Sequence, residues 1–102
     1  MDRLEYFLSL LEKSPDNPML HYSLAKEYER IGNCQKVIEH ARKYLELKED
    51  EGAIYRTLAR CLEEIGDIEG AKNALKEGIE KALKYNHPSM AEEFRAWLSE
   101  FG

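Results

Sequence analysis

Hydrophobic residues recur every three to four positions along most of the chain, which is the spacing of one face of an α-helix. In the first such segment the apolar side is formed by Leu4, Phe7, Leu8 and Leu11. Short polar or glycine-containing breaks separate it from five further segments, and no strand-like alternation is present. The pattern predicts an all-α protein with six helices, at about residues 2–13, 18–31, 34–47, 53–65, 68–85 and 90–101.

Residues that cap helices stand at the breaks. Asp2 with Glu5, and Ser89 with Glu92, have capping-box spacing. Other side chains that accept hydrogen bonds from the first turn of a helix precede three of the segments: Asn17, Asn33 and Asp67. These signals predict well-defined helix starts.

The chain repeats itself. Gly66-Asp67 lies 34 residues after Gly32-Asn33, and Leu58-Ala59 falls the same distance after Leu24-Ala25. A period of about 34 residues is typical of a repeated helical hairpin. Each glycine follows a segment with apolar helical periodicity, and a glycine in the left-handed conformation commonly ends a helix. Each unit is therefore expected to be a helix, a Gly-Asn or Gly-Asp turn and a second helix.

The repeat resembles the tetratricopeptide repeat. In one unit the resemblance rests on Leu24-Ala25, Tyr28, Gly32 and Val37; in the next, on Tyr55, Leu58-Ala59, Leu62, Gly66, Ala71 and Leu75. It implies an α-α superhelix of antiparallel helix hairpins, with about two and a half units and a C-terminal capping helix. We expect one domain over residues 1–102: a half repeat at 2–17, repeats at 18–51 and 52–85, and the capping helix at 88–102.

The end of the array departs from the family pattern. Leu83 stands where a closing proline is expected, so the fifth helix is predicted to run on to about Tyr85. Glu92-Glu93 falls where Leu-Gly is expected, so the sixth helix leaves the register. We interpret it as an end cover for the stack.

Composition narrows the classes of function. Charged residues make up 34% and the formal net charge is −5, which opposes a role in binding nucleic acid or anionic membranes. No apolar run is long enough to span a membrane, and the acidic start at Asp2 and Glu5 argues against a secretion signal. Cys34 and Cys61 are expected to be reduced, half-buried thiols of a cytoplasmic protein.

No catalytic pattern is present. The three histidines, His21, His40 and His87, have no second ligand at helical spacing and are expected to be unrelated side chains. Neither a phosphate-binding glycine loop nor a nucleophile elbow occurs. We therefore expect no enzyme activity, no metal and no cofactor.

The resemblance implies that the first helix of each unit lines a concave groove that receives a partner segment. Its outward residues are Tyr22, Lys26, Arg30, Arg56, Thr57 and Arg60. The cations among them suggest recognition of an acidic or carboxylate-bearing protein segment. A solvated helix face with local ion pairs explains the same residues.

The sixth helix carries Phe94, Trp97 and Phe101, of which most is expected to pack on the fifth helix through Leu75, Ile79 and Ala82. The remainder is a candidate self-association surface. Two functions follow: a non-enzymatic adaptor or scaffold that binds a peptide or partner protein, or a structural module that self-associates or completes an assembly. The expected state is a monomer or weak homodimer.

Overall fold

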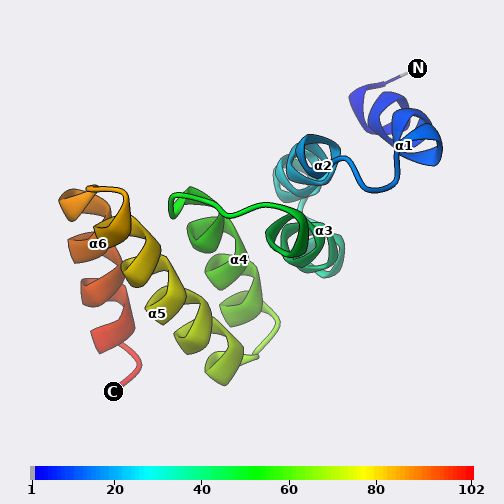
Figure 1. Ribbon diagram of the computed structural model, residues 1–102. Helices are drawn as coiled ribbons and strands as arrows, with labels where there is room; N and C mark the ends of the chain where they lie inside the picture. The colour runs from blue at the N-terminus through cyan, green and yellow to red at the C-terminus, as the bar shows by residue number, and fades with distance from the viewer. Residues whose placement is uncertain (1) are drawn as a thin grey trace. The chain divides into compact units, whose positions relative to one another are not determined.

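The computed structural model describes residues 2–102, which form six α-helices and no strand. The helices are α1 (Arg3–Lys13), α2 (Pro18–Ile31), α3 (Cys34–Leu47), α4 (Ala53–Glu64), α5 (Ile68–Lys84) and α6 (Pro88–Ser99). Figure 1 shows them joined by short connections. The predicted all-α class is confirmed, and each helix lies within two residues of its predicted bounds.

Two compact units make up the chain, one ending at Glu49 and one beginning at Asp50. The first contains α1, α2 and α3, and the second contains α4, α5 and α6 (Figure 1). The predicted boundary between the two full repeats, after residue 51, lies close to this division.

In the first unit, α2 and α3 form an antiparallel hairpin. Leu24 and Ala25 on α2 and Val37 and Ala41 on α3 are fully buried, because small and branched side chains let the two helices approach closely. Gly32 ends α2 in the left-handed conformation with φ of 82°. The predicted caps are confirmed at Asn17, which accepts from Met19 N–H, and at Asn33, which accepts from Lys36 N–H.

Helix α1 packs on α2 but contributes no fully buried residue to the first unit. Its predicted cap is confirmed, since Asp2 accepts a hydrogen bond of 2.8 Å from Glu5 N–H. The side chains of Tyr6 and Leu8 remain 51% and 37% exposed. Few buried contacts therefore hold α1 in place.

In the second unit, α5 packs between α4 and α6 (Figure 1). The core contains Ile54, Leu62, Leu75 and Phe94, all at most 2% exposed. A side chain at Gly78 would not fit, because its Cβ would lie 2.8 Å from Phe94 Cε2. Helix α5 continues to Lys84, as the absence of a proline at residue 83 predicted.

One predicted helix start is wrong. Helix α6 begins at Pro88, with His87 as its N-cap and no side-chain cap, so Ser89 and Glu92 do not form the predicted capping box. Proline suits the first helical position because its φ is already helical and it lacks the N–H that would stay unbonded. The helix therefore starts before Ser89, which lies inside the first turn.

Candidate functional site

A small pocket of about 200 Å³ opens between α1 and α2 in the first unit. It is lined by Arg3, Phe7, Tyr22, Ser23, Lys26 and Glu27. Two of the predicted groove residues, Tyr22 and Lys26, are therefore neighbours in this pocket. Arg3 and Phe7 of α1 complete it and were not predicted as site residues. The feature that indicates them is the amphipathic half repeat that precedes the first full unit.

On the aromatic side of this α1–α2 pocket, the ring of Tyr22 is supported by a residue of α3. The ring of Tyr22 packs edge-on against Tyr44 of α3, with 5.3 Å between ring centroids and an interplanar angle of 61°. Tyr44 is only 4% exposed. Because a buried ring supports it, Tyr22 has a restricted position before any ligand arrives.

The polar side contains the buried carboxylate of Glu27 and two cations, Arg3 and Lys26, and Arg30 pairs with Glu27 from outside the lining. Glu27 is 4% exposed, accepts a hydrogen bond of 2.9 Å from Arg30 Nε, and lies 3.7 Å from Arg3 Nη1. This hydrogen bond and the charge of Glu27 raise the pKa of Arg30 above its ordinary value. Lys26 Nζ lies 2.9 Å from Glu29. Arg30, a predicted ligand-binding cation, is therefore already paired with the buried Glu27.

The predicted groove residues of the second unit have a different environment. Arg56 donates two hydrogen bonds of 2.7 Å to the carboxylate of Glu93 on α6, and its guanidinium lies 5.6 Å from the ring centroid of Phe94. The hydrogen bond from Arg56 lowers the pKa of Glu93. Thr57 is 2% exposed. Arg56 is thus already bound by the carboxylate of Glu93 on α6, and Thr57 is buried. Arg60 remains exposed.

The aromatic side chains of α6 divide between the core, where most of the stripe was expected to pack, and half-buried positions that stay candidates for self-association. Phe94 is fully buried, so it belongs to the core and cannot contribute to a self-association surface. Trp97 and Phe101 are half-buried. The indole N–H of Trp97 donates a hydrogen bond of 2.9 Å to Glu63 on α4, which ties α6 to that helix.

Two histidines that were expected to be unrelated form a buried pair. Nδ1 of His21 lies 3.0 Å from Nδ1 of His40, and Nε2 of His21 lies 2.7 Å from the carbonyl oxygen of Pro15. The ring of Tyr28 stacks on His40, with centroids 5.6 Å apart. A second pocket, of about 350 Å³, opens beside the pair and is lined by His21, Glu39, His40, Arg42, Lys43 and Glu46.

The expectation of unrelated histidines is therefore wrong for His21 and His40. Spacing of metal ligands was the wrong signal, because the two residues come from different helices. The useful signal was the apolar face of each helix. His21 shares its face with Leu24, Ala25 and Tyr28, and His40 shares its face with Val37, Ala41 and Tyr44.

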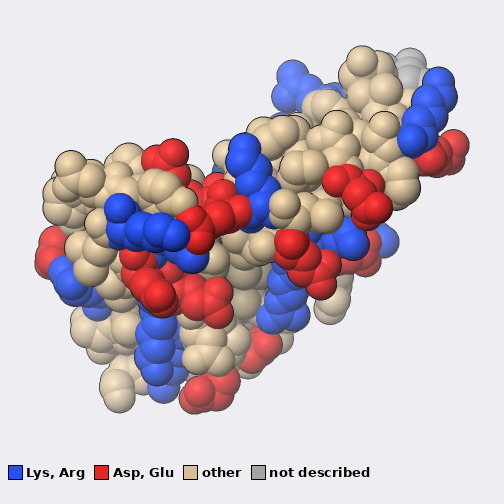
Figure 2. All heavy atoms as spheres, in the orientation of Figure 1, with Lys and Arg blue, Asp and Glu red and all other residues tan. Residues whose placement is uncertain are grey.

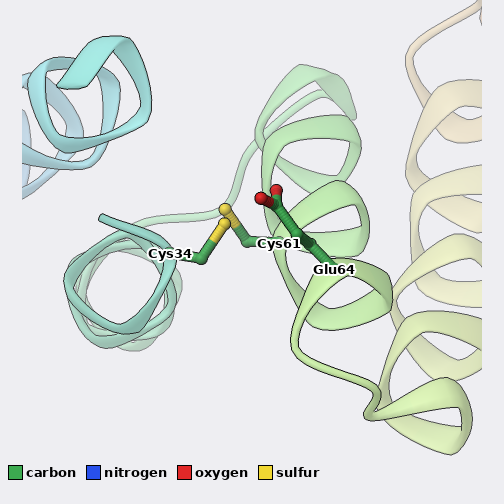
Figure 3. Close-up of side chains that lie close together, drawn as sticks. All are labelled: Cys34, Cys61 and Glu64. Atoms are coloured by element: carbon green, nitrogen blue, oxygen red, sulfur yellow. The ribbon is translucent and has the colours of Figure 1, made fainter. Parts of the chain in front are cut away.

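The cysteines are not the free thiols that were expected. Figure 3 shows Cys34, at the start of α3, together with Cys61 and Glu64 of α4. Both cysteines are disulfide-bonded. A metal binds the thiolate form of cysteine, which a disulfide does not provide. Because the thiols are not reduced, they do not support a cytoplasmic location, and that location stays a prediction.

Charged side chains of both signs alternate on the face shown in Figure 2, and no broad field of one sign is visible there. Among residues 2–102, no helix combines the length and apolar character needed to cross a membrane. The surface thus offers local charge contrasts, such as the one in the α1–α2 pocket, as recognition features.

Comparison with known proteins agrees with this architecture. A TPR repeat-containing protein of Pseudomonas aeruginosa is 25% identical over 95 residues, which cover 93% of this chain and 90% of the relative. The solution structure of a Bordetella parapertussis protein superposes with a TM-score of 0.80 at 22% identity, covering 98% of this chain and 87% of that one. No protein-family model matches the chain.

Fold and relative together define a helical repeat protein. The chain is similar to a TPR repeat-containing protein over most of its length, and its 34-residue period is typical of such helical repeats. This similarity suggests a protein-interaction module in general terms.

Proposed function

We propose that the protein is a non-enzymatic interaction module that holds a short acidic segment of a partner protein at the α1–α2 pocket. The observation that carries the proposal is the lining of this pocket. It combines the aromatic rings of Phe7 and Tyr22 with the cationic side chains of Arg3 and Lys26. Such a lining suits an apolar side chain flanked by carboxylates.

The size of the pocket limits what it accepts. Its volume of about 200 Å³ lies below the roughly 300–1,000 Å³ typical of sites for small molecules. One side chain of an extended segment matches this volume better than a cofactor does. Affinity would then come from a few contacts, so a weak and short-lived complex is expected.

The cations are available to different degrees. The side chain of Arg3 is 69% exposed and lies 3.7 Å from Glu27, which Arg30 already bonds more closely. Lys26 is 47% exposed and pairs with Glu29 on the same helix. An incoming carboxylate has to share Lys26 with Glu29, whereas Arg3 can turn towards it at little cost, because exposed ion pairs are weak.

The test is a titration with a labelled eight-residue peptide in which two glutamates flank a leucine on each side, followed by fluorescence polarisation. Lys26→Glu should weaken binding about tenfold, since hydrogen bonds to charged groups contribute about 1.5–3 kcal/mol. Lys36→Glu is the matched control: Lys36 has the same 47% exposure and its own partner three residues later, Glu39, but lies outside the pocket.

Two peptide variants separate charge from packing. Replacing the glutamates by glutamine should remove the difference between Lys26→Glu and Lys36→Glu, and replacing leucine by glycine should weaken binding to both. Equal loss of affinity in the two lysine variants would mean that only net charge matters, and the pocket would then have no role.

The alternative function, a structural module that self-associates, is favoured by α1. Its exposed Tyr6 and Leu8 are the kind of apolar side chains that oligomer interfaces bury. Sedimentation velocity over a wide concentration range, with Leu8→Asp as the comparison, tests it. A strict monomer at all concentrations removes this alternative, whereas an association that Leu8→Asp abolishes favours it over peptide binding.

A further inference from the structure

The hydrogen bonds around the buried histidine pair define which nitrogen carries each proton. The carbonyl oxygen of Pro15 only accepts, so Nε2 of His21 carries a hydrogen and donates it. In the neutral ring, Nδ1 of His21 is then unprotonated and accepts the Nδ1–H of His40 at 3.0 Å. Nε2 of His40 is left without a hydrogen. This chain of bonds runs from α3 through α2 to the connection before α2.

A first added proton fits this arrangement. It binds Nε2 of His40, which lies 3.5 Å from the carboxylate of Glu39, and it leaves both hydrogen bonds intact. Burial lowers the pKa of His40, the charge of Glu39 opposes this, and His21 and Lys36 add to the lowering. The first proton therefore binds without disrupting either hydrogen bond.

A second proton does not fit. It would bind Nδ1 of His21 and turn both Nδ1 atoms, 3.0 Å apart, into donors. The bond between the rings would be lost, and two positive charges would face each other in a site where each ring is only 6% exposed. Like charges this close and this poorly solvated repel strongly.

The groups around the pair do not offset this repulsion. On α2 the ring of Tyr28 stacks on His40, and on the connection Asp16 is 3.8 Å from Lys43. The charged residues of α3 that border the pair or its pocket are Lys36, Glu39, Arg42, Lys43 and Glu46. Three of these are cations and two are acids, so α3 adds no net negative charge.

The pair is connected to the α1–α2 pocket in two ways. His21 precedes Tyr22, which lines the pocket, and its ring holds Pro15 in the short connection between α1 and α2. Helix α1 has no buried residue, so its position depends on few contacts, and the His21–Pro15 bond of 2.7 Å holds the connection that follows it. Loss of the histidine pair therefore loosens the connection that aligns α1 with α2.

We propose that His21 and His40 form a pH-sensitive latch, which holds the α1–α2 pocket in its binding shape while at most one proton is bound to the pair and releases α1 when both rings are protonated. The binding half of this inference rests on the function proposed above for the pocket. The structural half concerns only the free protein and is testable without a ligand.

Nitrogen-15 NMR of the histidine rings tests the proton order in the unmodified protein. Between about pH 7.5 and 5, Nε2 of His40 should gain a proton before Nδ1 of His21 does. When α1 is released, the second proton binds more tightly than it does in the closed protein. Below the pH at which this begins, hydrogen exchange of the α1 amides, corrected for the exchange rate of an unstructured chain, should accelerate by up to about tenfold for each pH unit. Independent titration of the two rings, or α1 protection that does not change with pH, would overturn the latch.

His40→Gln removes one of the two ionisable rings, so that two positive charges can no longer face each other, and it keeps a side chain able to hydrogen-bond. It should abolish the pH dependence of α1 exchange. His87→Gln is the matched control, because His87 is half-exposed, lies in the second unit and pairs with Glu51 at 2.7 Å. The control should behave like the unmodified protein, and an equal effect of both variants counts against the proposal.

Peptide titration at both ends of the pH range tests the coupling to binding. Affinity for the acidic peptide should fall about fivefold or more in acid for the unmodified protein and for His87→Gln, but not for His40→Gln. If the peptide binds equally well at both pH values, the coupling is wrong. If it binds at neither, the proposed function is wrong, and α1 exchange alone decides about the latch.

Discussion

The predicted groove positions of the two units are equivalent by the 34-residue repeat, but their side chains have different contacts. Arg56 is the repeat equivalent of Tyr22, 34 residues later. Arg56 receives the Glu93 carboxylate from α6, whereas Tyr22 packs on Tyr44 and borders an open pocket. The additional helix packed in each unit therefore decides whether a groove residue is available. In the second unit α6, which follows the hairpin, supplies Glu93 to Arg56, and in the first unit α1, which precedes the hairpin, lines the pocket beside Tyr22.

This difference changes how the groove should be tested. Replacing Arg56 by glutamate looks like a test of ligand binding from the sequence. In the structure it would place two like charges against each other at Glu93 and disturb the packing of α6 on its unit. Lys26 is a better position, because its ion-pair partner Glu29 lies on the same helix and 47% of the Lys26 side chain is exposed.

The largest expected effect comes from Phe94→Ala, which tests whether α6 is part of the second core. The ring is fully buried against Gly78, and removing a buried phenylalanine typically costs about 3–5 kcal/mol. Urea unfolding followed by the fluorescence of Trp97, the one tryptophan of the chain, measures the loss. Hydrogen exchange should show it in α4, α5 and α6. Equal loss of protection in α2 and α3 would mean that the two units unfold together.

A smaller effect is expected from the equivalent helix caps. Asn33→Ala removes the bond to Lys36 N–H at 3.2 Å, and Asp67→Ala removes the bond to Gly70 N–H at 2.8 Å. Each should lower the free energy of unfolding by about 1 kcal/mol. The Asp67 substitution should cost slightly more, because the charge also favours the helix N-terminus. Chemical denaturation measures both, and Gln35→Ala, an exposed change beside the first cap, serves as control.

The smallest expected effect is the coupling between Arg56 and Glu93. A double-mutant cycle with Arg56→Gln and Glu93→Gln should give at most about 1 kcal/mol, because the pair is partly exposed and solvent screens it.

The same pair has a pH dependence of known sign. The pKa of Glu93 is lowered from its usual 4.5 in the folded protein, so the unfolded chain binds the proton more readily. The contribution is therefore present above about pH 4.5 and is lost as the pH falls through the lowered value. Urea midpoints of the unmodified protein and Glu93→Gln should converge in acid; a constant difference would show that the ion pair is not the cause.

Much of the fold was predictable because its determinants are local. The caps at Asp2, Asn17, Asn33 and Asp67 and the left-handed Gly32 each depend on a few neighbouring residues. The start of α6 was mispredicted, because a capping-box spacing at Ser89 and Glu92 competed with Pro88, and proline at the first helical position prevailed. The cysteine state was also mispredicted, since sequence spacing does not report pairing.

By itself the sequence determined the six helices, their turns and the repeat class, since apolar periodicity, glycine turns and caps act over a few residues. Only the tertiary structure decided which equivalent positions are open. Arg56 and Phe94 became internal when α6 packed on the second unit, and Tyr22 and Lys26 came to border a pocket with α1. The pairing of His21 with His40 has the same origin. Such contacts join residues from different helices, and the sequence pattern within one helix does not specify which residues of another helix will pack against it.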